Sequence, residues 1–312
     1  MIYAHISGTG SYVPEKVLTN DDLAEMVDTS DEWIRTRTGI KERRISTGET
    51  TSELATKAGK KALEDSGLPA QDIELIICAT ITPDSFMPSV ACIVQDKLGA
   101  HKAAAFDVSA ACTGMIYAMV TAEQFIKNGT YKNVMVIGSE VLSKVLNWED
   151  RGTCVLFGDG AGAVILSANK EKRGIIASNL LADGSKQEYL LCPADSNPFI
   201  TMQGQEVFKF AVRTIIENVK TILKKAKVES ESVKFVIPHQ ANKRIIELAA
   251  KSCKISIDKF YLNLDRYGNT SAASIGIALD ELIKEGKPQP GDKIILVGFG
   301  GGMTSGAILI NW

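Results

Sequence analysis

The 312-residue sequence has little of what stabilises small secreted domains or holds metals. Its six cysteines are scattered and form no CxxC pair, and it has only three histidines. No segment approaches the run of about 18 uncharged apolar residues that a membrane-spanning helix needs, and the N-terminus lacks a cationic start before an apolar stretch. These gaps argue against a disulfide scaffold, a zinc module and a membrane protein. We expect a cytoplasmic chain with reduced thiols and no metal.

An excess of charge of one sign is also missing. Lys and Arg total 35 against 37 Asp and Glu, so the formal net charge is −2 and no general nucleic-acid or membrane surface is expected. What the chain does have is 45% apolar and 23% charged residues, which is typical of a globular protein. Its length favours two domains, or two halves that share an interface.

Two pairs of apolar segments repeat at the same spacing. Ile77 in ELIICAT matches Ile237 in KFVIPHQ, and Gly138 in NVMVIGS matches Gly298 in KIILVGF. Both pairs lie 160 residues apart. The sequence therefore indicates a duplicated chain, because one spacing connects two independent matches.

Helical segments follow the same duplication. SAACTGMIYAM begins at Ser109 and SAASIGIALDEL begins at Ser271, and both show helical periodicity. Each half then ends on a glycine-rich hairpin signal, FGDGAGAVILS or FGGGMTSGAILIN. Continuous apolar strands that alternate with helices favour mixed, mainly parallel sheets covered on both faces. We expect an α/β chain of two stacked halves, residues 1–170 with the candidate nucleophile and residues 171–312 with the candidate histidine and asparagine.

Cys112 is the cysteine whose context favours chemistry. In AFDVSAACTGMIYAM a strand gives way to small residues and then to a helix. The unpaired N–H groups and positive dipole end of a first helical turn stabilise a thiolate and lower its pKa. The alternative is a small buried cysteine that packs between helix and sheet. None of the other five cysteines begins a helix among alanines.

His239 and Asn269 are the candidate partners of Cys112. His239 ends an apolar strand in VIPHQAN, at the edge where α/β sheets bind ligands, although a core or capping histidine is the alternative. Asn269 in DRYGNTSAAS is either a turn residue or a buried amide that donates a hydrogen bond without a proton to lose. If the halves stack about a pseudo-twofold axis, the three side chains converge.

Glycines 300–302 in VGFGGGMTSG form either a tight hairpin or part of the site. Beside a thioester, glycine lets a backbone N–H approach the reacting carbonyl. The N–H groups of Gly301 and Cys112 would then form an oxyanion hole.

Six motifs in order resemble the 3-ketoacyl-[acyl-carrier-protein] synthase III family over essentially the whole chain: DTSDEWIRTRTGIKER, SAACTG, WEDRGTCVLFGDGAGA, PHQANKRI, YGNTSAAS and VGFGGG. The resemblance implies a thiolase-like, five-layer α-β-α-β-α fold, a homodimer, and no metal or cofactor. It also implies an acyltransferase that initiates bacterial-type (type II) fatty acid synthesis. An acyl-CoA primer would load Cys112, and His239 with Asn269 would catalyse decarboxylative condensation with malonyl-acyl carrier protein to give 3-ketoacyl-acyl carrier protein, CO2 and CoA.

The resemblance further implies two sets of binding residues. Trp33 and Arg151 would sandwich the CoA adenine, Arg37 would reach its phosphates, and Gly204 and Asn242 would line the pantetheine tunnel. Docking of the carrier protein would involve Lys209, Gln240, Ala241, Asn242, Lys243 and Arg244. The plainer alternatives are an inward-facing Trp33, a surface ion pair at Arg151 and a solvated basic face.

Departures from the family pattern affect only the pocket walls. Met87 in DSFMP stands where the family often has a phenylalanine that limits acyl length across the dimer interface. Methionine is more pliable and leaves room for a longer or branched primer. Two other functions remain open at this point: a starter-unit ketosynthase for polyketide or other secondary metabolism, and a non-catalytic partner that binds acyl chains.

Overall fold

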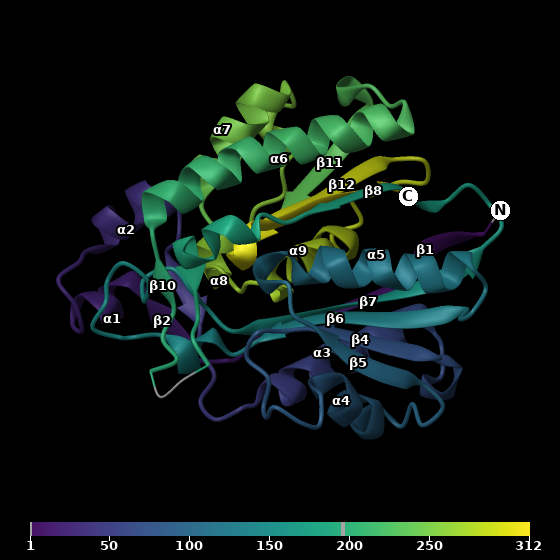
Figure 1. The fold of residues 1–312 in the computed structure, drawn as a ribbon, viewed down its shortest axis with the longest axis horizontal. Coiled ribbons are helices and arrows are strands. Elements are labelled where there is room, and N and C mark those ends of the chain that lie inside the picture. The colour runs from purple at the N-terminus through teal and green to yellow at the C-terminus, as the bar shows by residue number, and fades with distance from the viewer. Residues whose placement is uncertain (1, 195–196) are drawn as a thin grey trace.

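Five layers of helix and sheet are stacked in the molecule (Figure 1). The structure is a computed structural model and describes residues 2–194 and 197–312. Two outer pairs of helices cover two sheets, and a central pair separates the sheets. The outer pairs are α3 (Thr51–Ser66) with α4 (Val90–Leu98) and α6 (Gly204–Ala226) with α7 (Lys243–Cys253), and the central helices are α5 (Gly114–Lys127) and α9 (Ala273–Lys284). The expected α-β-α-β-α order is confirmed.

The first sheet has the strand order β1-β7-β6-β4-β5. Strand β4 pairs in parallel with β5 and β6, whereas β7 pairs antiparallel with both β6 and β1. The strands are β1 (Tyr3–Tyr12), β4 (Leu75–Ala79), β5 (Ala104–Val108), β6 (Asn133–Glu140) and β7 (Gly160–Asn169).

The second sheet repeats this order. It runs β11-β12-β13-β8, with β11 parallel to β12, and β13 antiparallel to β12 and β8. At the outer side of β11, where the first sheet has β5, Val236 forms a parallel bridge to Phe260. The strands are β8 (Gly174–Leu181), β11 (Val233–Pro238), β12 (Lys293–Gly300) and β13 (Thr304–Asn311). Both sheets are therefore mixed, and each half is built on one plan.

Local sequence explains where the helices begin and end. Helix α3 starts at a capping box in which the Thr50 side chain accepts from the Glu53 N–H and the Glu53 carboxylate accepts from the Thr50 N–H. It ends at Gly67, whose φ of 67° suits glycine. Helix α6 is amphipathic and packs its apolar side on the second sheet, where each fully buried large side chain contributes about 1.5–3 kcal/mol.

The central helices pack directly on strand backbones. A Cβ added at Gly138 of β6 would lie 2.1 Å from the carbonyl oxygen of Ala272, which caps the start of α9. Glycine is therefore required for this approach. Because α5 and α9 lie between the sheets, their beginnings meet at one level of the molecule, and this is where the candidate site residues occur.

Smaller elements surround that level. They are β2 (Val17–Thr19), α1 (Asn20–Ala24), α2 (Asp31–Thr38), β3 (Glu42–Arg44), β9 (Leu190–Leu191), β10 (Thr201–Met202) and α8 (Leu264–Tyr267). In the part of the chain that the structure describes, no helix has the length and apolar character needed to cross a membrane.

Candidate functional site

Cys112 lies between β5 and α5, as its sequence context indicates. It occupies a 3-10 turn, Ala111–Thr113, that directly precedes the first turn of α5. Ala111 has a φ of 45°, a left-handed conformation that is costly for a residue other than glycine. On the opposite side, a Cβ added at Gly300 would lie 2.7 Å from the Cys112 nitrogen. Cys112 is therefore held between a strained turn and the end of β12.

The electrostatics of Cys112 differ from the sequence expectation. Burial raises the pKa of its thiol to about 12, and a hydrogen bond with Ser271 acts in the opposite direction. The expectation that the helix start lowers this pKa was wrong, because the loss of solvation is the larger effect. Cys112 rests as a thiol, and a reaction at its sulfur would require a proton acceptor.

His239 directly follows β11, as predicted. Its backbone N–H donates to the Val297 carbonyl at 2.8 Å, and its ring lies edge-on to Phe299 with 5.3 Å between ring centroids. The ring Nδ1 lies 2.8 Å from the Ser274 hydroxyl of α9. Burial lowers the pKa of His239 to about 3, so the imidazole is neutral near pH 7.

Asn269 is fixed by its backbone and by its own side chain. Its N–H donates to Leu156 O at 2.9 Å, and its carbonyl accepts from Gly158 N at 3.0 Å. Its Oδ1 accepts from the Ser271 N–H at 2.8 Å, which leaves the Nδ2 hydrogens as donors. Among the described residues, none accepts a hydrogen bond from Nδ2, and the residue is 7% exposed. The amide can thus donate to a ligand.

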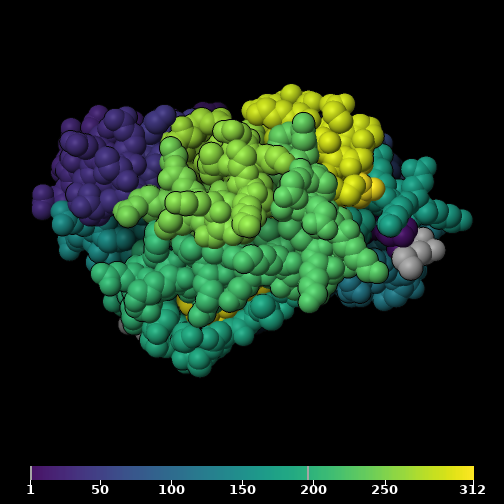
Figure 2. Space-filling model, turned by 90° about the horizontal axis from the view of Figure 1, so that it is seen from above, coloured from purple at the N-terminus to yellow at the C-terminus, as the bar shows by residue number. Residues whose placement is uncertain are grey.

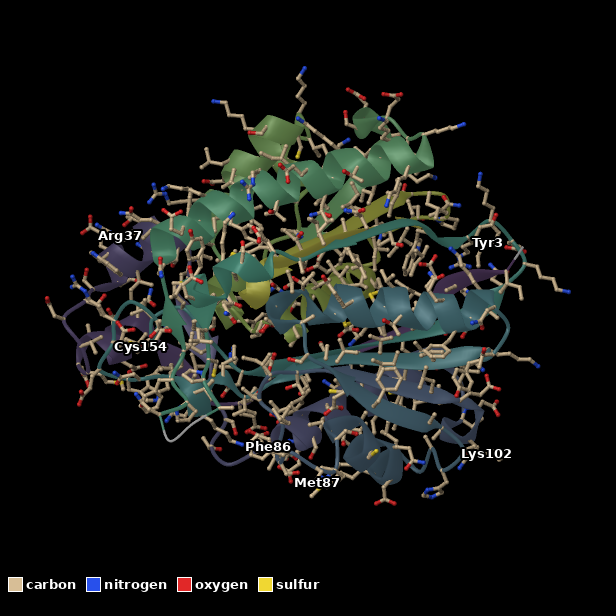
Figure 3. The ribbon with its side chains drawn as sticks, in the orientation of Figure 1. Tyr3, Arg37, Phe86, Met87, Lys102 and Cys154 are labelled. Atoms are coloured by element: carbon tan, nitrogen blue, oxygen red, sulfur yellow. The ribbon has the colours of Figure 1, made fainter. Side chains whose placement is uncertain are left out.

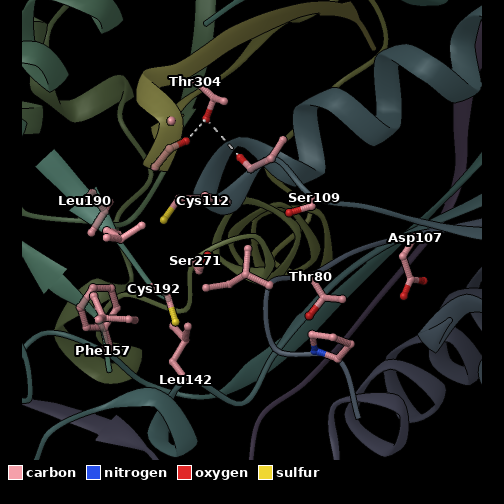
Figure 4. A pocket seen from close by; sticks show the side chains of 18 of the residues that line it. Thr80, Asp107, Ser109, Cys112, Leu142, Phe157, Leu190, Cys192, Ser271 and Thr304 are labelled. Atoms are coloured by element: carbon pink, nitrogen blue, oxygen red, sulfur yellow. Dashed lines mark hydrogen bonds between the residues drawn. The ribbon is translucent and has the colours of Figure 1, made fainter. Parts of the chain in front are cut away.

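Two adjoining cavities bring the candidate residues together. Cys112, His239 and Asn269 line the smaller cavity, together with Gly204 and Asn242. The larger cavity, of about 810 Å³, also reaches Cys112 and includes Gly301, Ser271 and apolar side chains such as Leu142 and Phe157 (Figure 4).

The glycine loop, residues 300–302, lies against the turn Ala111–Thr113, which carries the candidate nucleophile and is called the nucleophile turn below. Thr304 Oγ1 is 3.1 Å from the carbonyl oxygens of both Gly301 and Ala110, as the dashed lines in Figure 4 show. This hydroxyl connects the loop to the residues that precede Cys112, and the loop and the turn thus keep a fixed relation.

The residues predicted for the adenine are close together. The guanidinium carbons of Arg37 and Arg151 lie 4.5 Å and 5.1 Å from the centroid of the Trp33 ring, and Arg151 also pairs with Asp28. A ring between Trp33 and Arg151 needs a gap of about 7 Å, twice a van der Waals contact of about 3.5 Å. Arg151 must therefore move before an aromatic ring fits between them.

The predicted docking surface requires one correction. Lys209 of α6 and both Lys243 and Arg244 of α7 are exposed, and α6 and α7 together form the broad green face in Figure 2. Gln240 is 1% exposed, and its side chain donates to Pro238 O and Tyr261 O. The prediction that Gln240 contacts a carrier protein was wrong, because its amide is used inside the loop. Ala241 lines the smaller cavity.

Met87 lies away from the cavities of its own chain. It is 85% exposed and its neighbour Phe86 is 97% exposed, at the lower edge of the molecule in Figure 3. Phe86 reaches the rim of the larger cavity, whereas Met87 does not line it. A role of Met87 in an acyl pocket thus requires a second chain.

Sequence reasoning missed three polar residues around the site. Ser271 contacts Cys112, Ser274 contacts His239, and the buried Glu140 accepts from the Ser271 hydroxyl at 3.1 Å. A signal for Glu140 was present, because a carboxylate at the end of the apolar strand VMVIGSE must find hydrogen-bond donors when buried.

Comparison with known proteins places this architecture in one family. Residues 106–184 match the family model described as 3-oxoacyl-[acyl-carrier-protein (ACP)] synthase III, and residues 223–312 match its C-terminal counterpart. The beta-ketoacyl-[acyl-carrier-protein] synthase III of Clostridium acetobutylicum is 55% identical over 98% of both chains. The chain belongs to the 3-oxoacyl-[acyl-carrier-protein] synthase III family. The beta-ketoacyl-[acyl-carrier-protein] synthase III of Caldanaerobacter subterraneus is 53% identical over 100% of this chain and 98% of its own.

Solved structures of synthase III proteins share the fold. The Aquifex aeolicus 3-oxoacyl-[acyl-carrier-protein] synthase III superposes with a TM-score of 0.97 at 53% identity and covers 99% of this chain and 100% of its own. The priming beta-ketosynthase of the R1128 polyketide pathway gives 0.95 at 30% identity, with coverage of 99% and 96%. The chain therefore has the thiolase-like fold expected from its motifs.

Proposed function

We propose that this chain is the initiating condensing enzyme of type II fatty acid synthesis, an acyltransferase that joins an acyl-CoA primer to malonyl-acyl carrier protein. The observation that carries the proposal is one small cavity lined by Cys112, His239 and Asn269, in a chain more than half identical to named synthase III enzymes. The products are 3-ketoacyl-acyl carrier protein, CO2 and CoA. In this proposal residues 1–170 supply the nucleophile and residues 171–312 supply the two donors.

The first half-reaction is acyl transfer. The Cys112 sulfur attacks the thioester carbonyl, CoA leaves as its thiol, and the acyl group stays on the enzyme. The oxygen of the tetrahedral adduct takes hydrogen bonds from the Cys112 and Gly301 N–H groups. Support comes from the glycine loop that Thr304 connects to the nucleophile turn.

The second half-reaction is decarboxylative condensation. Loss of CO2 from the malonyl group leaves an enolate, whose oxygen accepts hydrogen bonds from His239 Nε2 and Asn269 Nδ2. We assign the ring proton of His239 to Nε2, because Ser274 Oγ lies on Nδ1 and already accepts a weak bond from Gln240 N at 3.4 Å. The low pKa of His239 keeps it a neutral donor, and the carbanion then attacks the acyl-Cys112 carbonyl. Every step uses side-chain or backbone groups of this chain, with no cofactor.

Substrate binding follows from the surroundings of the site. CoA lies along Gly204 and Asn242, with its phosphates at Arg37 and its adenine between Trp33 and a displaced Arg151. The exposed Lys209, Lys243 and Arg244 attract the acidic carrier protein. They stand on the face beside the N-terminal segment, where Asn242 Nδ2 donates to Arg37 O at 3.0 Å.

The enzyme works as a homodimer in the cytoplasm in this proposal. Phe86 and Met87 are apolar and exposed near β5, the edge strand of the first sheet, and a second chain would cover them. In the dimer Met87 reaches the acyl pocket of the partner. All six cysteines are free thiols, which suits a reducing compartment.

Intact-mass spectrometry tests the function. The protein is incubated with a panel of acyl-CoAs, the adduct is mapped, and malonyl-acyl carrier protein is then added. We expect a mass gain on Cys112 that the second substrate removes as a 3-ketoacyl product. Cys112→Ser should abolish loading, and His239→Ala should load but not condense. Absence of an adduct with every acyl-CoA would refute the proposal, and the panel also identifies the primer.

A further inference from the structure

Glu140 is a buried carboxylate that the proposed mechanism leaves without a role. It is the last residue of β6 and is 0% exposed. Among the described residues, no lysine or arginine pairs with it, and hydrogen bonds alone oppose the cost of its burial. Such a group, one hydrogen bond behind Ser271 in the wall of the larger cavity, requires an explanation.

Four donors from two segments surround this carboxylate. Oε2 accepts from Thr82 Oγ1 at 2.6 Å, from Thr80 Oγ1 at 3.0 Å and from the Ile81 N–H at 3.1 Å. Oε1 accepts from Ser271 Oγ at 3.1 Å. One oxygen is thus held by the loop after β4, and the other faces Ser271.

Ser271 connects Glu140 to the nucleophile. Its hydroxyl donates to Glu140 at 3.1 Å. It lines the same cavity as Cys112, whose thiol pKa it lowers and beside which it lies in Figure 4. Its orientation is fixed, because its φ is 49° and its N–H donates to Asn269 Oδ1. The sulfur, the hydroxyl and the carboxylate thus follow one another in space.

We propose that Glu140 is a positioning residue that takes up the Cys112 proton through the Ser271 hydroxyl. The inference rests on the proposed function and names the acceptor that its first half-reaction needs. As the sulfur attacks the thioester, its proton passes to Ser271 Oγ, and the hydroxyl proton of Ser271 passes to Glu140 Oε1. When the carbon–sulfur bond to CoA breaks, the same path returns one proton to the CoA sulfur, and Glu140 is again a carboxylate.

The acidity of the neighbouring groups agrees with this path. Burial raises the pKa of Glu140 to about 7 against the hydrogen bonds that lower it, so it can both accept and release a proton near neutrality. His239, with a pKa lowered to about 3 by burial, is a much weaker acceptor. The titratable groups that feel the charge of Glu140 are the thiols of Cys78, Cys112 and Cys192.

The direction in which Glu140→Gln changes the reactivity of Cys112 distinguishes this role from a purely electrostatic one. A carboxylate near Cys112 raises the pKa of the thiol. If Glu140 acted only through its charge, Glu140→Gln would therefore make Cys112 more reactive. If Glu140 accepts the proton, the same variant makes Cys112 less reactive.

Alkylation of Cys112 by iodoacetamide, followed by mass spectrometry across pH, measures that sign. In the parent we expect the rate to rise with a midpoint at about 7, the pKa of Glu140. In Glu140→Gln this midpoint should vanish and leave only the steady rise expected of a thiol of high pKa, and the rate near neutrality should fall by about 10²-fold or more. Ser271→Ala, which removes the connecting hydroxyl, should behave in the same way. A parent-like or faster rate in folded Glu140→Gln would overturn the inference.

Thr82→Val is the matched variant that keeps the carboxylate. Loss of a donor that favours the charged form raises the pKa of Glu140, and the midpoint should move to higher pH. An unchanged midpoint would contradict the role of Glu140. If either variant at Glu140 or Thr82 does not fold, Thr80→Val and Ser271→Ala give the same two readouts.

The alkylation assay needs no acyl-CoA, so its result does not depend on whether the proposed function is correct. If the parent does not load acyl groups but shows the midpoint and its loss in Glu140→Gln, the function is wrong and the proton path stands. If the parent loads and Glu140→Gln loads with the same rate and pH profile, the function stands and the path is wrong.

Discussion

Gly300→Ala tests how closely the end of β12 determines the position of the nucleophile. The φ of Gly300 is −169°, an extended conformation that any residue adopts, so the substitution adds no backbone strain. Its effect is steric. The new methyl would lie 2.7 Å from the Cys112 nitrogen and 3.2 Å from the Thr113 nitrogen. Since ordinary contact begins at about 3.4 Å, the nucleophile turn must move by about 0.7 Å.

That displacement predicts a larger effect on rate than on stability. A misplacement of about 1 Å costs about 10²-fold in rate, so we expect acyl loading to slow by about 10- to 100-fold. Overpacking of this size lowers the free energy of unfolding by about 1–3 kcal/mol. The rate of acyl loading is measured by rapid mixing and quenching followed by intact-mass spectrometry, and the stability by thermal unfolding.

Gly298→Ala is the matched control, two residues earlier on the same strand. Its methyl would meet the Ile116 and Ile275 side-chain ends at 3.3 Å and 3.4 Å, and such ends shift at low cost. We expect near-parental loading from it. If Gly300→Ala also loads at the parental rate, the close backbone approach does not position Cys112, and the argument from geometry is refuted.

Three further predictions follow from the site. In the unfolded chain His239 has an ordinary pKa of 6.5 and takes up a proton below that pH, whereas the folded protein keeps it neutral down to a pH of about 3. The free energy of unfolding should therefore decrease as the pH falls below 6.5. Thermal unfolding should show a steeper decrease in the parent than in a folded His239→Gln variant. Trp33→Ala should raise the KM for acyl-CoA by about 10-fold through loss of stacking and cation–π contact, without changing the KM for malonyl-acyl carrier protein in steady-state assays. Arg244→Glu should raise the KM for malonyl-acyl carrier protein and reduce its salt dependence, whereas Lys220→Glu, at an exposed position toward the C-terminal end of α6, should do neither.

The duplicated plan and the convergence of the site residues could be predicted from the sequence. The pairs Ile77/Ile237 and Gly138/Gly298 share one spacing because both lie in buried strands of the two copies. This spacing predicted a duplicated chain, and the structure has two sheets with the same strand order. Cys112, His239 and Asn269 were located because each follows a recognisable strand or turn. The motifs then supplied the family.

The failures have a common physical cause. The acidity of Cys112 depends on how much water surrounds its sulfur, and a helix start in the sequence says nothing of that. The orientation of Gln240 and the proximity of Glu140 to Ser271 depend on contacts between residues more than 20 positions apart. Sequence patterns predict where a backbone turns, whereas burial and hydrogen-bond direction emerge only when the segments pack.

The repeat between α5 and α9 has a consequence for how the two halves divide their work. In the matched segments, which begin at Ser109 and Ser271, the position of Cys112 corresponds to Ser274. In the proposed mechanism the first copy places a sulfur there that bonds to carbon, and the second places an oxygen there that holds His239. Matched positions of the two segments thus carry two unlike atoms. The proposed reaction depends on this loss of symmetry between the copies, and restoring it by Ser274→Cys or Cys112→Ser would remove one of the two tasks.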